Sequence, residues 1–317
     1  MEEQMLKRFC LFILICLPFS LSAQAMFQIL GKAERLIASD EQNYTQPVWS
    51  ADGSKIAYTG DNYRGLWVIN SDGTSPLKLS DEAGAGFDFQ WSADSREILT
   101  RVSRFDSGRR LNAIKSFNVD TRTEKILREF TQQKLGLPRW TPDNSQVYFY
   151  NGSSIELVNT GKRLKNYAEQ PLFFLKYGHI YSLGSARDMI NAPDVIVNGE
   201  CLNLRVSPDG KKISYELLGG NLFVVNTDGS NRTDLGKGYN ARWAPDSNHL
   251  IFMITEDDGH TFLSSDLFIS DINGNNKVNL TNTTDKLEMN PCWDPQGGKI
   301  VYDDYRDGAI YLLNLMQ

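Results

Sequence analysis

Residues Trp49 to Tyr58 read WSADGSKIAY, and this ten-residue phrase decides the fold. An aromatic residue is followed by a small polar residue, then by Ala or Pro, an Asp-Gly pair and alternating apolar residues. Period-two alternation on both sides of Asp-Gly predicts a β-hairpin. A hairpin that returns along one chain indicates an array of similar units. The phrase returns as WSADSREILT from Trp91, WTPDNSQVYF from Trp140, VSPDGKKISY from Val206, WAPDSNHLIF from Trp243 and WDPQGGKIVY from Trp293.

We call the first residue of each phrase its anchor. The number of units depends on whether the widest gap between consecutive anchors contains a further unit. Between Trp140 and Val206 the stretch 170–173 (QPLF) matches 46–49 (QPVW), with Phe173 in place of the anchor. Ile180 then follows Phe173 at the spacing at which Ile56 follows Trp49. We therefore prefer seven units and keep six as the alternative.

Each unit continues with a second pair of apolar runs. In the first unit Leu66 to Asn70 lead into the turn Ser71-Asp72-Gly73 and a further run at Leu77 to Leu79. Four antiparallel strands in about 40 residues are typical of a propeller blade. The prediction is an all-β chain, a β-propeller of four-stranded antiparallel blades.

The two ends of the chain predict how the ring closes. The last unit ends after three strands, and Ala33 to Ala38 resemble a fourth. We expect this N-terminal strand to complete the last blade, because that pairing removes an open sheet edge.

Residues 1–25 have the pattern of a secretory signal peptide. Lys7 and Arg8 precede an apolar run at 9–19, and Ser22-Ala23-Gln24-Ala25 follow. The run is shorter than the roughly 20 residues of a membrane-spanning helix. We expect cleavage after Ala23 or Ala25, a single propeller domain over 26–317 without a membrane span, and a periplasmic or secreted protein.

Composition limits the partners. The chain is 41% hydrophobic and 23% charged, with a formal net charge of −6, as in ordinary soluble domains. No Lys/Arg-rich run is present, which argues against a nucleic-acid partner. Beyond the signal segment only Cys201 and Cys292 remain, in units that are not neighbours, so we expect two free thiols rather than a disulfide.

The WSxDG and SPDG phrases, the Asp-Gly turn after an apolar strand and the signal segment together resemble the TolB-like β-propeller repeat family of bacterial envelope proteins. The likeness runs from about residue 30 to residue 317. TolB itself carries an N-terminal α/β domain before a six-bladed propeller, and this sequence has no room for that domain. The resemblance implies the fold and an envelope location, and we assign no Tol-complex partner from it.

A binding site is expected where the long loops gather. Short turns such as 51–54 and 71–73 belong on one rim, and the loops 60–65, 101–112, 256–265 and 303–308 on the other. Polar residues stand three positions before most anchors (Gln46, Asp88, Gln170, Asn203, Asn240 and Asn290, with Leu137 as the exception). They serve either local turn bonds or ligand contact. The candidate binding residues on this rim and at the channel mouth are Arg104, Arg109, Asp258, Asp303, Arg306, Asn203, Asn240 and Asn290.

Catalytic patterns are missing from the sequence. His179, His249 and His260 stand in different units without HExxH spacing, and no G-x-S-x-G elbow occurs. We predict no catalytic residues, no metal and no cofactor, and we read the repeated turn aspartates as turn chemistry rather than calcium ligands.

The leading hypothesis is an exported, non-enzymatic propeller that binds a protein or cell-envelope component through its long-loop face. One alternative is an enzyme, either polysaccharide-active like oligogalacturonate lyase or a lactonase. It would need a divalent ion near Asp88, Asn203, Asn240 or Asn290. Another is an appendage that caps a larger envelope assembly without a ligand of its own.

Overall fold

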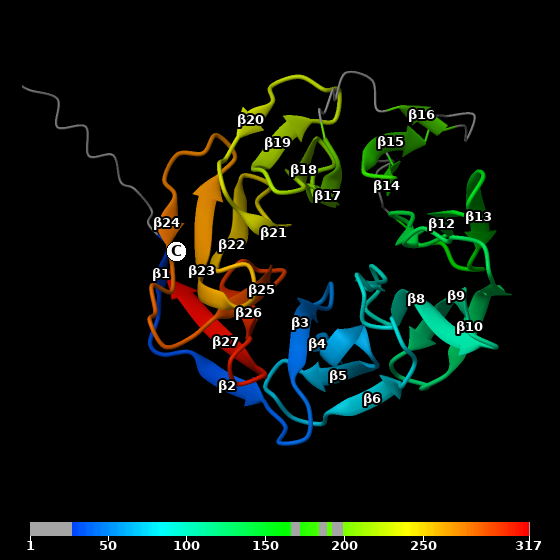
Figure 1. Ribbon diagram of the computed structural model, residues 1–317, viewed down its shortest axis with the longest axis horizontal. Coiled ribbons are helices and arrows are strands. Elements are labelled where there is room, and N and C mark those ends of the chain that lie inside the picture. The colour runs from blue at the N-terminus through cyan, green and yellow to red at the C-terminus, as the bar shows by residue number, and fades with distance from the viewer. Residues whose placement is uncertain (1–26, 166–171, 184–188, 192–198, 317) are drawn as a thin grey trace, which may run out of the picture.

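The structure is a computed structural model that describes residues 27–165, 172–183, 189–191 and 199–316. The expected signal peptide lies outside these residues. The described strands form antiparallel sheets that follow one another around a ring (Figure 1). The all-β propeller fold is therefore confirmed. In the described ranges no helix is long and apolar enough to cross a membrane.

Seven sheets make up the ring. The first contains β3 (Tyr44–Trp49), β4 (Lys55–Gly60), β5 (Leu66–Asn70) and β6 (Leu77–Ser80), with the 3-10 turn Asp61–Tyr63 between β4 and β5. The second contains β7 (Gln90–Trp91), β8 (Glu97–Asp106), β9 (Arg109–Asn118) and β10 (Glu124–Thr131). The third contains β11 (Arg139–Trp140), β12 (Gln146–Tyr150) and β13 (Ile155–Asn159), and the fourth β14 (Leu172–Lys176), β15 (His179–Leu183) and β16 (Met189–Asn191).

The remaining three sheets come from the C-terminal half. One contains β17 (Cys201–Val206), β18 (Lys212–Leu217), β19 (Leu222–Asn226) and β20 (Thr233–Asp234). The next contains β21 (Tyr239–Trp243), β22 (His249–Asp257), β23 (Phe262–Asp271) and β24 (Val278–Asn279). The last joins β25 (Glu288–Trp293), β26 (Lys299–Asp304) and β27 (Ala309–Met316) to the N-terminal strands β1 (Gln28–Ile29) and β2 (Glu34–Ile37).

Six of the sheets are built on the repeated hairpin. In each, the anchor pairs with the apolar residue at the same spacing, as Trp49 does with Ile56 and Trp293 with Ile300. These six sheets are the blades of the propeller, which is the alternative count from the sequence.

The sheet β14–β16 stands in the ring but does not follow the repeat. Phe173 pairs with Ser182 and Leu175 with Ile180, so the predicted pairing of Phe173 with Ile180 is wrong. The physical reason is the turn: Tyr177 and Gly178 both have positive φ, and this two-residue turn pairs Lys176 with His179. It therefore sets a different register from the longer Asp-Gly turn. Gln170, part of the predicted match, lies outside the described residues.

The ring closes as the sequence predicted. β2 pairs antiparallel with β27, with Arg35 opposite Tyr311. β1 pairs with the far end of β27, where Gln28 faces Met316. The N-terminal strands thus cover the edge that β27 would otherwise leave open, next to β26 and β25 (Figure 1).

Hydrogen bonds from the indole N–H give a physical reason why the phrase often begins with tryptophan. Trp91 Nε1 donates to the carbonyl oxygen of Val48 at 3.1 Å, and Trp243 Nε1 donates to that of Arg205 at 3.3 Å. Trp140 makes the same bond to Gln90. Each bond joins an anchor to the innermost strand of the preceding blade, so the anchor fixes the spacing between blades.

The turn aspartates hold their own hairpins. Asp52 Oδ1 accepts bonds from the Ser54 backbone N–H at 3.0 Å and from the Ser50 hydroxyl at 2.7 Å. Burial would raise the pKa of Asp52, but these bonds outweigh it and lower the pKa to about 2. Asp52 Oδ1 therefore serves the turn itself, as the turn chemistry read from the sequence requires.

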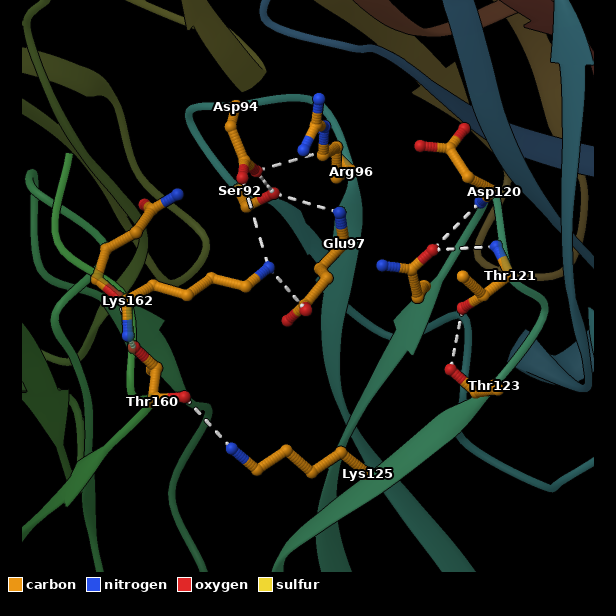
Figure 2. A network of polar contacts seen from close by, with 12 residues as sticks. Ser92, Asp94, Arg96, Glu97, Asp120, Thr121, Thr123, Lys125, Thr160 and Lys162 are labelled. Carbon is orange, nitrogen blue, oxygen red and sulfur yellow. Dashed lines mark hydrogen bonds and ion pairs between the residues drawn. The ribbon is translucent and has the colours of Figure 1, made fainter.

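The same turn in the next blade also contacts its neighbour. Figure 2 shows Ser92 donating to Asp94 while its hydroxyl accepts from the Glu97 backbone. Lys162, which follows β13 in the next blade, reaches back to Glu97 at 2.6 Å. Polar contacts on the short-turn rim thus join these two neighbouring blades. Away from it, Cys201 and Cys292 are free thiols, as expected.

Deleting residues 26–40 should unfold the protein, because it removes both strands that pair with β27. Deleting only 26–30 removes β1 and leaves β2 in place, so that form should stay folded with a lower melting temperature. Circular dichroism during heating measures both. An unchanged melting temperature after the larger deletion would show that closure does not depend on β2.

Changing Trp91→Phe should lower the free energy of unfolding by about 1 kcal/mol more than Trp49→Phe does. Both changes replace the indole by the smaller phenyl group. Only the change at Trp91 loses a hydrogen bond, since the buried Trp49 Nε1 has no partner among the described residues. Urea denaturation of the two variants measures the difference. Equal losses would contradict the role given to the indole N–H.

Candidate binding site

The innermost strands carry a bulge three residues before most anchors. The backbone there is left-handed, with φ between 48° and 56° in Gln46, Asp88, Asn203, Asn240 and Asn290. The strand pairing shifts register at four of these positions. Asn and Asp enter this region at lower cost than other non-glycine residues. The polar pattern read from the sequence is therefore partly a backbone requirement.

The side chains at these bulges bond beyond their own turns, some within the same blade and some to other blades. Asn290 is the centre: its Nδ2 donates to Asp303 at 3.0 Å, and its Oδ1 accepts from Asn240 at 2.8 Å. Asp303 also accepts from the Gln46 backbone N–H at 2.9 Å and the Thr45 hydroxyl at 3.0 Å. This network joins the first blade to the last two.

Two buried acids in this region hold their protons more tightly than usual. Burial raises the pKa of Asp303 to about 7, and the bonds from Asn290, Gln46 and Thr45 offset only part of the shift. Burial also raises the pKa of Glu216, which accepts a bond from Asn203 at 2.9 Å. Neither acid has an arginine or lysine bonded to it in the described residues.

Asp88 lies in the opposite electrostatic environment. Arg139 Nη2 contacts its Oδ2 at 2.5 Å and Arg205 Nη2 its Oδ1 at 2.7 Å. Burial would raise the pKa of Asp88, but the charges of Arg139, Arg205 and Arg242 hold it well below its usual range. Burial and repulsion from Arg242 and Arg139 lower the pKa of Arg205 to about 10 despite Asp88. Two guanidinium groups therefore contact this carboxylate, and the charge of Arg242 also acts on it.

A cavity of about 1050 Å³ opens above these groups on the long-loop face. Its floor includes Asp88, Arg139 and Arg205, and Asn290 and Asp303 also line it. Pairs of aromatic rings line it too: Tyr63 with Phe87, Tyr150 with Tyr177, and Phe262 with Tyr305. The cavity thus combines apolar walls with a charged floor.

Charge is divided between the sides of this cavity. Lys134 and Lys176 line it beside β11 and β14. Asp61 and Asp257 line it beside β4 and β22, in blades on the other side of the ring (Figure 1). A ligand with a charged end would therefore be oriented within the cavity.

Half of the predicted binding residues line this cavity. They are Asn203, Asn240, Asn290 and Asp303. Arg306 and Asp258 are exposed on neighbouring loops, where Asp258 accepts backbone bonds within its own turn at His260 and Thr261.

Arg104 and Arg109 lie on strands rather than on the predicted loop 101–112. That stretch is a hairpin of β8 and β9 with its turn at Ser107 and Gly108. Arg104 packs over the Phe130 ring at 4.0 Å, outside the cavity. Alternating side chains and the Ser-Gly turn favour a longer hairpin here over an irregular loop.

Sequence reasoning missed the three arginines whose charges act on Asp88. Arg139, Arg205 and Arg242 each stand one residue before an anchor, a position that the sequence analysis did not compare. The shared position places them on the innermost strands β11, β17 and β21. Reading the residue before each anchor would have found them.

The residues that the enzyme alternative requires do not fit a divalent ion. Asp88 is neutralised by two arginines, and Asn290 and Asn203 bond to Asp303 and Glu216. Across the described ranges, no group of three or more His, Cys, Asp or Glu side chains could hold a metal ion. A cation at Asp88 would also meet repulsion from Arg242.

Comparison with solved structures supports the fold. TolB from Acinetobacter baumannii matches with a TM-score of 0.55 and 17% identity over 82% of this chain, which spans 59% of that TolB. An oligogalacturonate lyase in complex with manganese matches at 0.52 and 12% identity over 92% of this chain and 97% of the lyase. A putative TolB from Agrobacterium tumefaciens matches at 0.50 and 17% identity, over 87% and 91% of the two chains.

These similarities show a TolB-like β-propeller fold, and at such identities they show the fold alone. No family model and no curated protein matches the sequence.

The wild-type protein should lose stability as pH rises from about 4 to about 7, and Asp303→Asn should reduce that loss. Folding takes up a proton in this window, because the pKa of Asp303 rises from 3.8 to about 7. One proton changes the free energy of unfolding by up to about 1.4 kcal/mol per pH unit. The raised pKa of Glu288 acts in the same direction, so part of the dependence should remain.

Urea denaturation at several pH values measures this dependence. Asp258→Asn is the matched control, because Asp258 is exposed and its turn bonds lower its pKa. An Asp303→Asn variant with the wild-type pH dependence would show that Asp303 is ionised in the folded protein.

Proposed function

We propose that this chain is an exported, non-enzymatic β-propeller that binds a protein of the cell envelope through the cavity on its long-loop face. The observation that carries the proposal is the cavity itself, about 1050 Å³ in volume, with aromatic walls and charge divided between its sides. Export to the periplasm or beyond the cell rests on the basic, apolar and small-residue order of residues 1–25.

The walls have the chemistry of a protein interface. Phe87, Phe262 and Tyr305 are 40%, 38% and 60% exposed although they are large and apolar. Aromatic residues are enriched at the energetic centres of protein interfaces. Leu202, also 40% exposed, adds an aliphatic contact at the same cavity. Exposed rings around a concave site therefore favour a partner that inserts side chains.

The second candidate is an enzyme acting on acidic polysaccharides. It is favoured by the near-complete mutual coverage of the manganese-bound oligogalacturonate lyase. The poor fit of the floor residues to a divalent ion weighs against it. Release of unsaturated uronate from oligogalacturonate with added manganese would support the enzyme and overturn the binding proposal.

Tyr305→Ala and Phe87→Ala should each weaken partner retention about tenfold, the usual effect of losing an aromatic contact at an interface centre. Immobilised wild-type protein and variants are incubated with envelope extract, and retained proteins are quantified by mass spectrometry. Ile126→Ala is the matched control, because Ile126 is exposed on the outer strand β10 away from the cavity.

Only proteins that are kept by the Ile126→Ala variant and lost by both cavity variants count as partners. Retention that does not change with Tyr305 or Phe87 would show that this face is not the binding site.

A further inference from the structure

We infer that Arg139 and Arg205, with the charge of Arg242 close by, form a carboxylate-binding subsite at the floor of the cavity, which takes an acidic side chain of a bound peptide segment. This inference rests on the proposed function and names the chemistry of the partner. Asp88 occupies part of the subsite as an internal counter-ion.

The charges around the floor of the cavity do not cancel. The side chains of Arg139, Arg205 and Asp88 are only 17%, 13% and 16% exposed, so water screens their charges poorly. Asp88 compensates one of three positive charges, in a chain whose formal net charge is −6. An anion that enters from the cavity would therefore be stabilised.

Two of the arginine side chains also have N–H groups that lack a hydrogen-bond partner within the described residues. These groups are at the Nε atoms of Arg205 and Arg242, and both atoms are buried. Buried charged groups without full compensation cost free energy of folding. A ligand carboxylate would recover part of that cost by adding a negative charge beside the guanidinium groups.

The propeller fold does not require an arginine at the residue before the anchor. The residue before the anchor is Val48 in the first blade, Gln90 in the second and Cys292 in the last. An uncharged side chain therefore packs at this position in half of the blades. The three arginines gather in the other half, around Asp88, although the architecture does not require charge there.

The chemistry of the floor and walls indicates which ligand the subsite takes. Guanidinium groups recognise planar carboxylates through paired N–H donors. The basic side continues upward from the floor to Lys134 and Lys176 at the cavity wall. An extended segment with several acidic side chains would follow this path, while its apolar side chains contact the aromatic pairs. The aliphatic contacts at Leu202 and Met289 favour a peptide over a sugar chain.

The test uses calorimetry with a synthetic, end-capped peptide of one tryptophan and three glutamates. The matched peptide carries glutamine in place of glutamate, and trigalacturonate supplies carboxylates on a sugar. The glutamate peptide should bind the full-length mature protein, more weakly at high salt, and the glutamine peptide should bind at least about tenfold more weakly.

Changes at Arg205 and Asp88 should move the affinity in opposite directions. Arg205→Gln should weaken binding of the glutamate peptide about tenfold, because Arg205 lines the cavity, whereas Arg205→Lys should keep most of it because the charge stays. Asp88→Asn should strengthen binding, since it removes the competing carboxylate. Melting temperatures of all variants verify that each is folded.

Each outcome decides the inference. Weaker binding after Asp88→Asn, or no change after Arg205→Gln, would overturn it. Binding of trigalacturonate without the glutamate peptide would assign the subsite to a sugar acid instead. A third result is a peptide affinity that is unchanged in the arginine variants while retention of envelope proteins still depends on Tyr305. That result would exclude the carboxylate subsite and leave the proposed function supported.

Discussion

Closure of the ring is the constraint on which the rest of the structure depends. β2 must reach β27 across almost the whole length of the chain, and that pairing carries a large loop-closure entropy. Asp303 adds a second tie, since it accepts bonds from Thr45 and from the Gln46 backbone in the first blade. The cavity lies between all blades, so it keeps its shape only while both ties hold. Fold and binding face are therefore one cooperative unit.

The bulges convert this ring into a site. A regular innermost strand would continue its alternation to the long-loop face, whereas a left-handed residue turns the strand and places a polar side chain at the channel mouth. Asn240 then bonds to Asn290, and Asn290 bonds to Asp303, across the last two blades. The same left-handed bulge, repeated in most blades, thus places polar side chains at the channel mouth and allows them to bond to neighbouring blades.

Much of this could be predicted from the sequence, because the hairpin phrase carries its own register. Anchor pairing, the closing strand and the rim of short turns follow from Asp-Gly turns and period-two alternation. Prediction failed at Phe173, where a two-residue turn at Tyr177 and Gly178 replaces the repeated one. It also failed at Arg104 and Arg109, which a longer hairpin places on strands. The floor arginines depend on blades that are distant in sequence, so local pattern could suggest their strand but not their meeting.

The same type of side chain takes two charge states in one channel, and the reason is local. Asp303 is buried among amides and hydroxyls, so its pKa rises to about 7, while arginines keep Asp88 ionised. Near neutral pH and below, the side of the channel beside the last blade therefore carries less negative charge than its composition suggests. The side around Asp88 keeps a positive excess. This asymmetry comes from placing the arginines in three blades only, and it gives a symmetric ring a direction in which a charged ligand can bind.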